Sequence, residues 1–254
     1  MWPLFLRLRP ARLWIEAHRI GREAARAAGD RAGELRMLTS GGTGLRNAGA
    51  GEEASEWFTE ALELAREVGE PLVEADALYG LSQTHRTAGR LTEAADCLRG
   101  TAALRESRGY DRGTALARLA LGEVLIVAGR PAEAVPVVVE AHRVLTAVPA
   151  PYEAARALAF LGQAQVALGA HDEADRCYAE ALAEFRAGRA RHWEARVLEL
   201  LGDLARARGD LVGAAARYGE SFARYRALVA PDAARVEAAL AALAAPPGPP
   251  PATD

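Results

Sequence analysis

The sequence contains no lysine, and all 31 of its basic residues are arginine. This absence excludes catalytic devices that need an amine: the Walker A phosphate loop, a Schiff-base lysine, the lysine of a kinase fold and a Ser-x-x-Lys hydrolase centre. The 34 acidic residues bring the net charge to −3 and the pI to about 6.0. We therefore expect no direct nucleic-acid partner and no membrane partner.

Cysteine and long apolar runs are also scarce. Cys97 and Cys177 are the only two cysteines, too few for a disulfide framework, and they favour a reducing compartment. The apolar start of the chain, MWPLFLRLRP, is interrupted by Pro3 and Arg7 and is too short for a signal sequence or a spanning helix. We predict a cytoplasmic protein.

Helix-forming residues are abundant in the sequence, and several residues recur at a fixed interval. Alanine, leucine, arginine and glutamate dominate, whereas aromatic residues make up only 6%. Several markers recur every forty residues, and each keeps its place relative to the others. They are the glycines 49, 89, 129, 169 and 209, the alanines 54, 94, 134, 174 and 214, and the larger side chains Phe58, Leu98, Val138, Tyr178 and Tyr218.

Each forty-residue repeat is interpreted as two helices. The first helix, for example residues 113–127, ends at the repeat glycine. Glycine has no Cβ and therefore adopts the left-handed C-cap conformation at the lowest energetic cost. The second helix, for example residues 172–187, begins with an acidic turn suited to the helix dipole. A two-helix repeat cannot bury its apolar face alone, so the repeats must stack. The sequence therefore predicts an all-α, right-handed alpha-alpha superhelix.

The repeat resembles the tetratricopeptide (TPR) motif, although forty residues exceed the usual length of that motif. Leu121-Gly122 stands at the Leu-Gly pair of the motif, followed by Ala134 and Val138, and the next two repeats match equally well. The prediction is a TPR solenoid over residues 9–243 with a leading half-repeat and a capping helix. Its expected parts are a helix 9–27, repeats 33–67, 73–107, 112–146, 152–187 and 192–227, a cap 232–243, an irregular stretch 1–8 and a Pro-rich tail 244–254.

Two segments depart from the pattern. Ser40 to Gly44 form a glycine-rich stretch where other repeats have Leu-Gly; it lacks the features of a phosphate loop and is interpreted as a weakened helix in which each glycine costs about 1 kcal/mol. Pro136 lies inside a predicted helix and is expected to kink it or to delay its start.

The residues give no indication of a catalytic, metal or cofactor site. Five histidines fall at five different positions of the repeat and form no ligand motif. Cys97 and Cys177 share one position but lie two repeats apart, about 20 Å if helices pack ~10 Å from each other, beyond the reach of a disulfide. We predict a non-enzyme with no cofactor and no metal.

The resemblance to TPR proteins implies a concave surface lined by the first helix of each repeat. Carried over onto this register, the candidate partner-binding residues form an apolar middle between two polar, arginine-rich ends, which favours an acidic protein or peptide with an apolar centre. The alternative is that these side chains are merely solvated. The candidates are Arg36, Arg46, Asn47, Asp76, Tyr79, Gln83, Arg86, Leu119, Glu123, Ile126, Arg156, Gln163, Arg196, Glu199, Asp203 and Arg206.

The stretches AHRIGREAARAAGDRAGE and LLGDLARARGDLVGAAARYGESFARYRAL resemble the C-terminal repeats of actinobacterial transcriptional regulators of the SARP/AfsR and NB-ARC (STAND) types. In those regulators the repeats sense a partner, so the resemblance implies a sensor or regulatory module involved in transcription regulation. The alternative is a scaffold that forms a homodimer through its unpaired N-terminal helix.

Overall fold

The computed structural model describes residues 11–244. The predicted irregular stretch 1–8 and all of the predicted tail beyond residue 244 lie outside the described residues.

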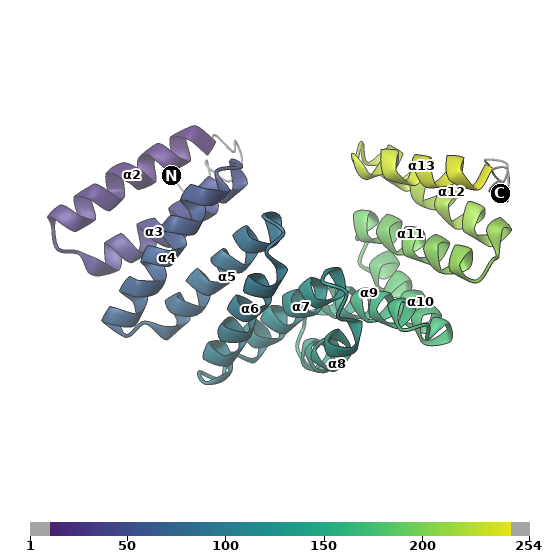
Figure 1. The fold of residues 1–254 in the computed structure, drawn as a ribbon, viewed down its shortest axis with the longest axis horizontal. Coiled ribbons are helices and arrows are strands. Elements are labelled where there is room, and N and C mark those ends of the chain that lie inside the picture. Colours follow the sequence, from purple (N-terminus) through teal and green to yellow (C-terminus); the bar gives the residue numbers. More distant parts are fainter. Residues whose placement is uncertain (1–10, 245–254) are drawn as a thin grey trace, which may run out of the picture. The chain divides into compact units, whose positions relative to one another are not determined.

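Every regular element in residues 11–244 is an α-helix, and none is a strand. The predicted fold class, an all-α array of helical hairpins, is confirmed (Figure 1). The helices are α2 (Ala11–Ala27), α3 (Arg31–Asn47), α4 (Gly51–Val68), α5 (Pro71–Thr87), α6 (Leu91–Glu106), α7 (Asp111–Val127), α8 (Pro131–Ala147), α9 (Pro151–Ala167), α10 (His171–Ala187), α11 (Arg191–Ala207), α12 (Leu211–Ala227) and α13 (Asp232–Ala244).

The chain divides into two compact bodies, an N-terminal body of residues 1–144 and a C-terminal body of residues 145–254. Within each body, consecutive helices pack against each other: α2 to α7 in the first, and α9 to α13 in the second. The first helices of successive hairpins also contact each other directly, α3 with α5 and α9 with α11. The first helices therefore lie on the inner side of each stack.

A left-handed residue ends almost every helix. The predicted C-cap conformation of the repeat glycines is confirmed, with φ between 71° and 84° at positions 49, 89, 129, 169 and 209. The same conformation recurs at Gly29, Gly69 and Gly109, so the left-handed turn repeats every twenty residues. The forty-residue pattern of the sequence did not reveal this shorter interval. At Gly89 the neighbouring amide of Arg90 donates to the His85 carbonyl at 2.9 Å, the longer bond of a Schellman turn.

Three turns lack the glycine. Arg189 and Val229 adopt φ values of 53° and 52°, which costs a side-chain-bearing residue about 1–2 kcal/mol. Pro149 occupies the same position between α8 and α9, where its ring holds φ negative. There the amide of Ala150 donates instead to the Val148 carbonyl at 2.7 Å. The turn between α8 and α9 therefore differs chemically from the other turns.

In four of the five described hairpins, a side chain of the second helix packs against a glycine of the first helix, sixteen residues earlier; the hairpin of α5 and α6 has Ser82 at this place. A Cβ added to Gly162 would lie 2.4 Å from the Tyr178 ring, and one on Gly202 would lie 2.6 Å from the Tyr218 ring. Both tyrosines are only 1% exposed. Gly42 with Phe58 and Gly122 with Val138 repeat the arrangement. Glycine is thus required at these positions because the facing ring, or Val138 in one hairpin, occupies the place of its side chain.

The glycine-rich stretch of residues 40–44 lies in the uninterrupted helix α3. Its extra glycines make room for tryptophans: a Cβ on Gly41 would lie 2.3 Å from Trp57, and one on Gly44 would lie 2.2 Å from Trp14. The Trp14 indole Nε1–H also donates to the Ser40 carbonyl at 3.1 Å. The stretch is therefore a packing surface, and its interpretation as a local fault was incomplete. Helix α8 starts at Pro131 and contains Pro136. Of the two effects predicted for Pro136, the delayed start is therefore wrong, and the kink stays a prediction.

Two alanine substitutions in one hairpin test the packing of glycine against a ring. Gly202→Ala is expected to lower the free energy of unfolding by about 1–3 kcal/mol, because the new methyl group overlaps the Tyr218 ring. Gly219→Ala, in α12, meets no atom within 4 Å and is expected to raise it by about 0.5–1 kcal/mol. Urea unfolding of the two variants measures both effects, and equal effects of the same sign would contradict the packing account.

Candidate functional site

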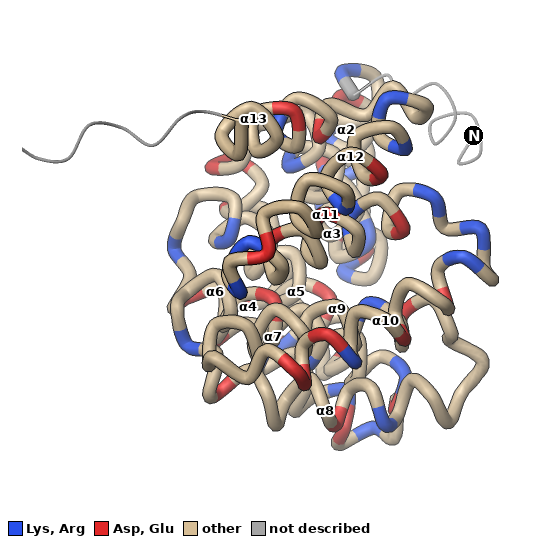
Figure 2. Tube along the Cα trace, turned by 90° about the vertical axis from the view of Figure 1, so that its right-hand side faces the viewer, with Lys and Arg blue, Asp and Glu red and all other residues tan. Residues whose placement is uncertain are grey.

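The sixteen candidate residues all lie on first helices, which form two surfaces. The N-terminal wall is the solvent-facing side of α3, α5 and α7, and the C-terminal wall is that of α9 and α11. Basic and acidic positions are interspersed along the helices of each body (Figure 2). Many charged side chains therefore lie close to an opposite charge. A charged side chain without such a neighbour is a candidate for binding a partner.

The N-terminal wall brings polar candidates from three helices together. The Arg86 guanidinium donates to Gln83 Oε1 at 3.3 Å on its own helix and lies 3.7 Å from the Glu123 carboxylate on α7. Arg46, on α3, donates to Asn47 Oδ1 at 3.4 Å. Burial lowers the pKa of Arg46, as does the positive charge of Arg86. These five side chains present alternating donors and acceptors across one surface.

Other candidates of the same body are already engaged elsewhere. Asp76 accepts a hydrogen bond from Arg105 at 2.7 Å, and the Arg105 guanidinium also lies over the Tyr79 ring, 5.7 Å from its centre. Arg36 lies 3.8 Å from Asp30. Leu119 is only 1% exposed, so the prediction that it faces a partner was wrong: it belongs to the core of the body.

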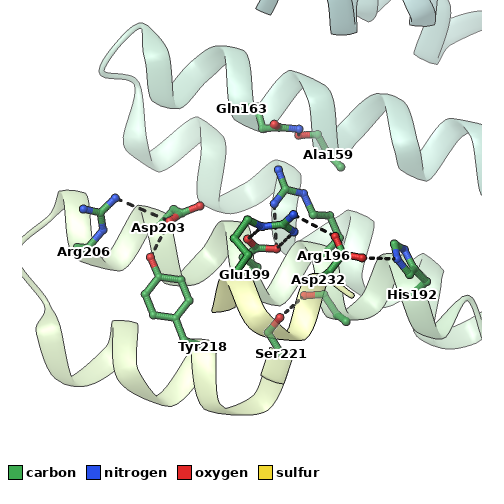
Figure 3. A network of polar contacts seen from close by, with 12 residues as sticks. Ala159, Gln163, His192, Arg196, Glu199, Asp203, Arg206, Tyr218, Ser221 and Asp232 are labelled. Carbon is green, nitrogen blue, oxygen red and sulfur yellow. Dashed lines mark hydrogen bonds and ion pairs between the residues drawn. The ribbon is translucent and has the colours of Figure 1, made fainter. Parts of the chain in front are cut away.

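The C-terminal wall contains a buried carboxylate that links three side chains (Figure 3). Glu199 accepts two hydrogen bonds from Arg235 of α13, at 2.6 and 2.8 Å, and lies 2.9 Å from the Arg196 guanidinium. Burial alone would raise the pKa of Glu199, but the two arginines more than offset this and lower it. Glu199 therefore attaches the capping helix to the wall and has little capacity left for a partner.

Two further acidic residues extend this network. The Tyr218 hydroxyl donates to Asp203 Oδ1 at 2.6 Å, and burial together with this bond raises the pKa of Tyr218 to about 12. Asp232, on α13, lies 3.3 Å from His192 Nε2 and 3.0 Å from Arg235. Asp203 also lies 3.9 Å from Arg206. The network ties α11, α12 and α13 together (Figure 3).

Helix α9 supplies Arg156 and Gln163. The Gln163 amide donates to the Ala159 carbonyl at 3.5 Å. The Arg156 guanidinium lies over two rings, 5.3 Å from the centre of Trp193 and 5.8 Å from that of Phe160. Sequence reasoning missed these aromatic neighbours, although the spacing of four residues between Arg156 and Phe160 places both on one helix face.

A serine and a histidine meet in the N-terminal body, which the sequence did not suggest. His18 Nε2 lies 3.0 Å from Ser40 Oγ, and His18 Nδ1 lies 2.7 Å from the Trp14 carbonyl oxygen. This is the spacing of a nucleophile and its base. Both residues lie in mid-helix, however, where backbone amides are used by the helix itself, so neither supplies the oxyanion donors that acyl transfer requires.

A cavity of about 400 Å³ lies where α2, α3 and α4 meet. Arginines pair with three of its four glutamates: Arg26 pairs with Glu34 and Glu60, and Arg31 lies 2.6 Å from Glu67. The cavity is thus part of the ion-pair network that attaches α2.

Residues 11–244 contain no group of three metal-ligating side chains and no helix long and apolar enough to cross a membrane. Cys97 and Cys177 are free and half-buried, and burial raises the pKa of each thiol.

Comparison with known proteins gives a family match for part of the chain. Residues 111–187 match the tetratricopeptide repeat model. This segment begins at the first residue of α7 and ends at the last residue of α10, so it covers the third and fourth hairpins. No curated protein matches the sequence.

Solved structures share the fold at low sequence identity. BtubC from P. vanneervenii is 17% identical with a TM-score of 0.71, over 96% of this chain and 97% of that one. A STAND protein from Pyrococcus horikoshii with a tetratricopeptide repeat sensor is 13% identical with a TM-score of 0.70, but the match covers 83% of this chain and only 33% of that one. A Rap protein complexed with Competence and Sporulation Factor is 14% identical, with a TM-score of 0.65 over 76% of this chain and 54% of that one.

The pKa of Glu199 leads to a test of the C-terminal network. Because its pKa is lowered in the folded state, its contribution to stability is complete above the unfolded value of about 4.3 and is lost as the pH falls through the folded value. Glu199→Gln should lower the free energy of unfolding at pH 7 by about 1–3 kcal/mol, since Glu199 is buried whereas Arg235 is half-exposed and rehydrates.

Thermal unfolding between pH 7 and pH 3 measures both effects. The variant should lose less stability than the wild type on acidification, and Glu180→Gln, an exposed change on α10, should match the wild type. A Glu199→Gln protein that is as stable at pH 7 and as sensitive to acid as the wild type would show that the network contributes nothing.

Proposed function

We propose that this chain is a non-catalytic scaffold of the tetratricopeptide type that binds a protein or peptide on the walls of its first helices. The observation that carries the proposal is the N-terminal wall, where Arg46, Asn47, Gln83, Arg86 and Glu123 come together from three helices. Half-exposed side chains of mixed donor and acceptor character, held by packed helices, suit the recognition of a peptide backbone and its side chains.

The compared proteins support this proposal. One similar structure is a Rap protein in complex with Competence and Sporulation Factor, and another is a STAND protein with a repeat sensor. Together with the resemblance of the sequence to repeats of SARP/AfsR-type and NB-ARC regulators, they favour a cytoplasmic sensor or regulatory module related to transcription regulation. The partner in this proposal is a protein or peptide, and neither nucleic acid nor a membrane.

A peptide selection tests the proposal. Peptides selected from a random library on the purified chain should bind saturably, and Arg86→Glu should weaken them about tenfold or more, as expected when a binding contact is removed. The matched control is Arg99→Glu on α6, the second helix of the same hairpin, which makes a comparable pair with Asp96 three residues away but lies off the wall. This control should leave the affinity unchanged.

Two outcomes would contradict the proposal. One is a library that yields no saturable binder, and the other is a set of binders that Arg99→Glu weakens and Arg86→Glu does not. Equal melting temperatures of the two variants are required, so that a change in affinity reports on the wall and not on folding.

The second candidate function, a self-associating scaffold, is favoured by one feature of α2. Leu13 and Ile20 are 62% and 60% exposed, and with the exposed Ala17 and Ala24 they follow the alternating three- and four-residue spacing of a coiled-coil seam. Sedimentation separates the two candidates: a dimer that Ile20→Glu converts to a monomer favours the scaffold, and a monomeric wild type eliminates it.

A further inference from the structure

Arg156 differs from the residues at the same position of the other repeats. Forty residues later, Arg196 is 2.9 Å from Glu199. Arg36 and Asp76, at the same position of the first two repeats, pair with Asp30 and with a neighbouring arginine. Arg156 makes no ion pair with any carboxylate in residues 11–244. It is a wall cation whose charge no carboxylate of the described residues matches.

The sequence explains the missing partner. Glu199 stands three residues after Arg196, within reach along one helix face. The residue three positions after Arg156 is Ala159, which is fully buried and carries no charge. Figure 3 shows Ala159 and Gln163 on α9, in the same view as the paired Arg196 and Glu199 of α11. The carboxylate that follows Arg196 by three residues therefore has no counterpart three residues after Arg156.

The geometry holds the Arg156 guanidinium in a defined place. It lies over the Trp193 and Phe160 rings, and those rings meet edge to face with centres 5.9 Å apart. Trp193 also stacks on Phe185 at 5.4 Å. Such a support fixes the plane of the guanidinium and reduces the entropy that a ligand would otherwise have to remove.

The hydrogen-bonding state of Arg156 points the same way. Its Nε is buried and has no acceptor, and its Nη groups make no hydrogen bond with any part of the chain that the structure describes. A guanidinium offers up to five donors, in a fork that matches the two oxygens of a carboxylate. The rings shield part of the Arg156 guanidinium from water. A hydrogen bond from this guanidinium to a carboxylate is therefore stronger than the same bond in open water.

We infer that Arg156, supported by Trp193, is the subsite for an acidic side chain of the bound partner. This inference rests on the proposed function and specifies it: a glutamate or aspartate of the peptide binds at α9, and Arg196 contributes less because Glu199 already neutralises it. The apolar faces of the neighbouring rings favour an aliphatic or aromatic residue next to the acidic one.

A small-molecule titration tests the subsite without a known partner. The probe is N-acetyl-glutamate methylamide, and the neutral control probe is N-acetyl-glutamine methylamide. The NMR signals of the Arg156 Nε–H and the Trp193 indole N–H should shift saturably with the glutamate probe and remain unchanged with the glutamine probe. Arg156→Gln should abolish the shift of the Trp193 signal, whereas Arg196→Gln, the matched change one repeat later, should keep it.

The remaining outcomes separate this inference from the proposed function. Equal shifts with both probes, or a shift of the Trp193 signal that survives Arg156→Gln, would overturn the subsite. Selected peptides that bind the walls equally well after their acidic residues are changed to amides would overturn the subsite and leave the proposed function standing. A saturable shift with the glutamate probe, in a chain for which no library peptide binds, would support the subsite at Arg156 and contradict the proposed function.

Discussion

The structure depends on the close approach of the two helices in four of its five described hairpins, at the point where a buried ring or branched side chain rests on the bare backbone of a glycine. Tyr178 on Gly162 and Tyr218 on Gly202 are the clearest instances. A side chain in place of either glycine would push the helices apart, and a smaller ring would leave a cavity. The sixteen-residue interval between the partners sets the register within the hairpin, and the forty-residue period sets the register between successive first helices.

That alignment determines which side chains share a wall. Positions forty residues apart become neighbours on a wall, which is why Arg46 of α3 senses the charge of Arg86 on α5. It also lets the chain use wall positions for contacts between its own helices. Glu199 binds Arg235 and so attaches the last helix, whereas no acid stands three residues after Arg156, whose charge we propose is matched by a partner. A repeat protein can thus distribute similar positions between stability and recognition.

The forty-residue period was enough to predict helical hairpins, because glycine at a left-handed turn and alanine at a close contact leave a regular mark in the sequence. The structural role of Gly41 and Gly44 could not be foreseen, since the rings that occupy their places come from Trp57 and Trp14, on two other helices. Leu119 was misassigned because a motif position predicts a helix face only approximately. The support of Arg156 by Trp193, on a different helix, likewise follows from packing that no spacing encodes.

The most direct test of the account is the proton NMR spectrum of the glycine α-protons. Protons close above an aromatic ring are shifted by its ring current, so the signals of Gly42, Gly162 and Gly202 should lie well away from ordinary helical glycine values. Gly219, which faces no side chain within 4 Å, and Gly122, which faces Val138, should show ordinary values. Ordinary shifts at all five glycines would contradict the packing on which the hairpins, the walls and the proposed recognition depend.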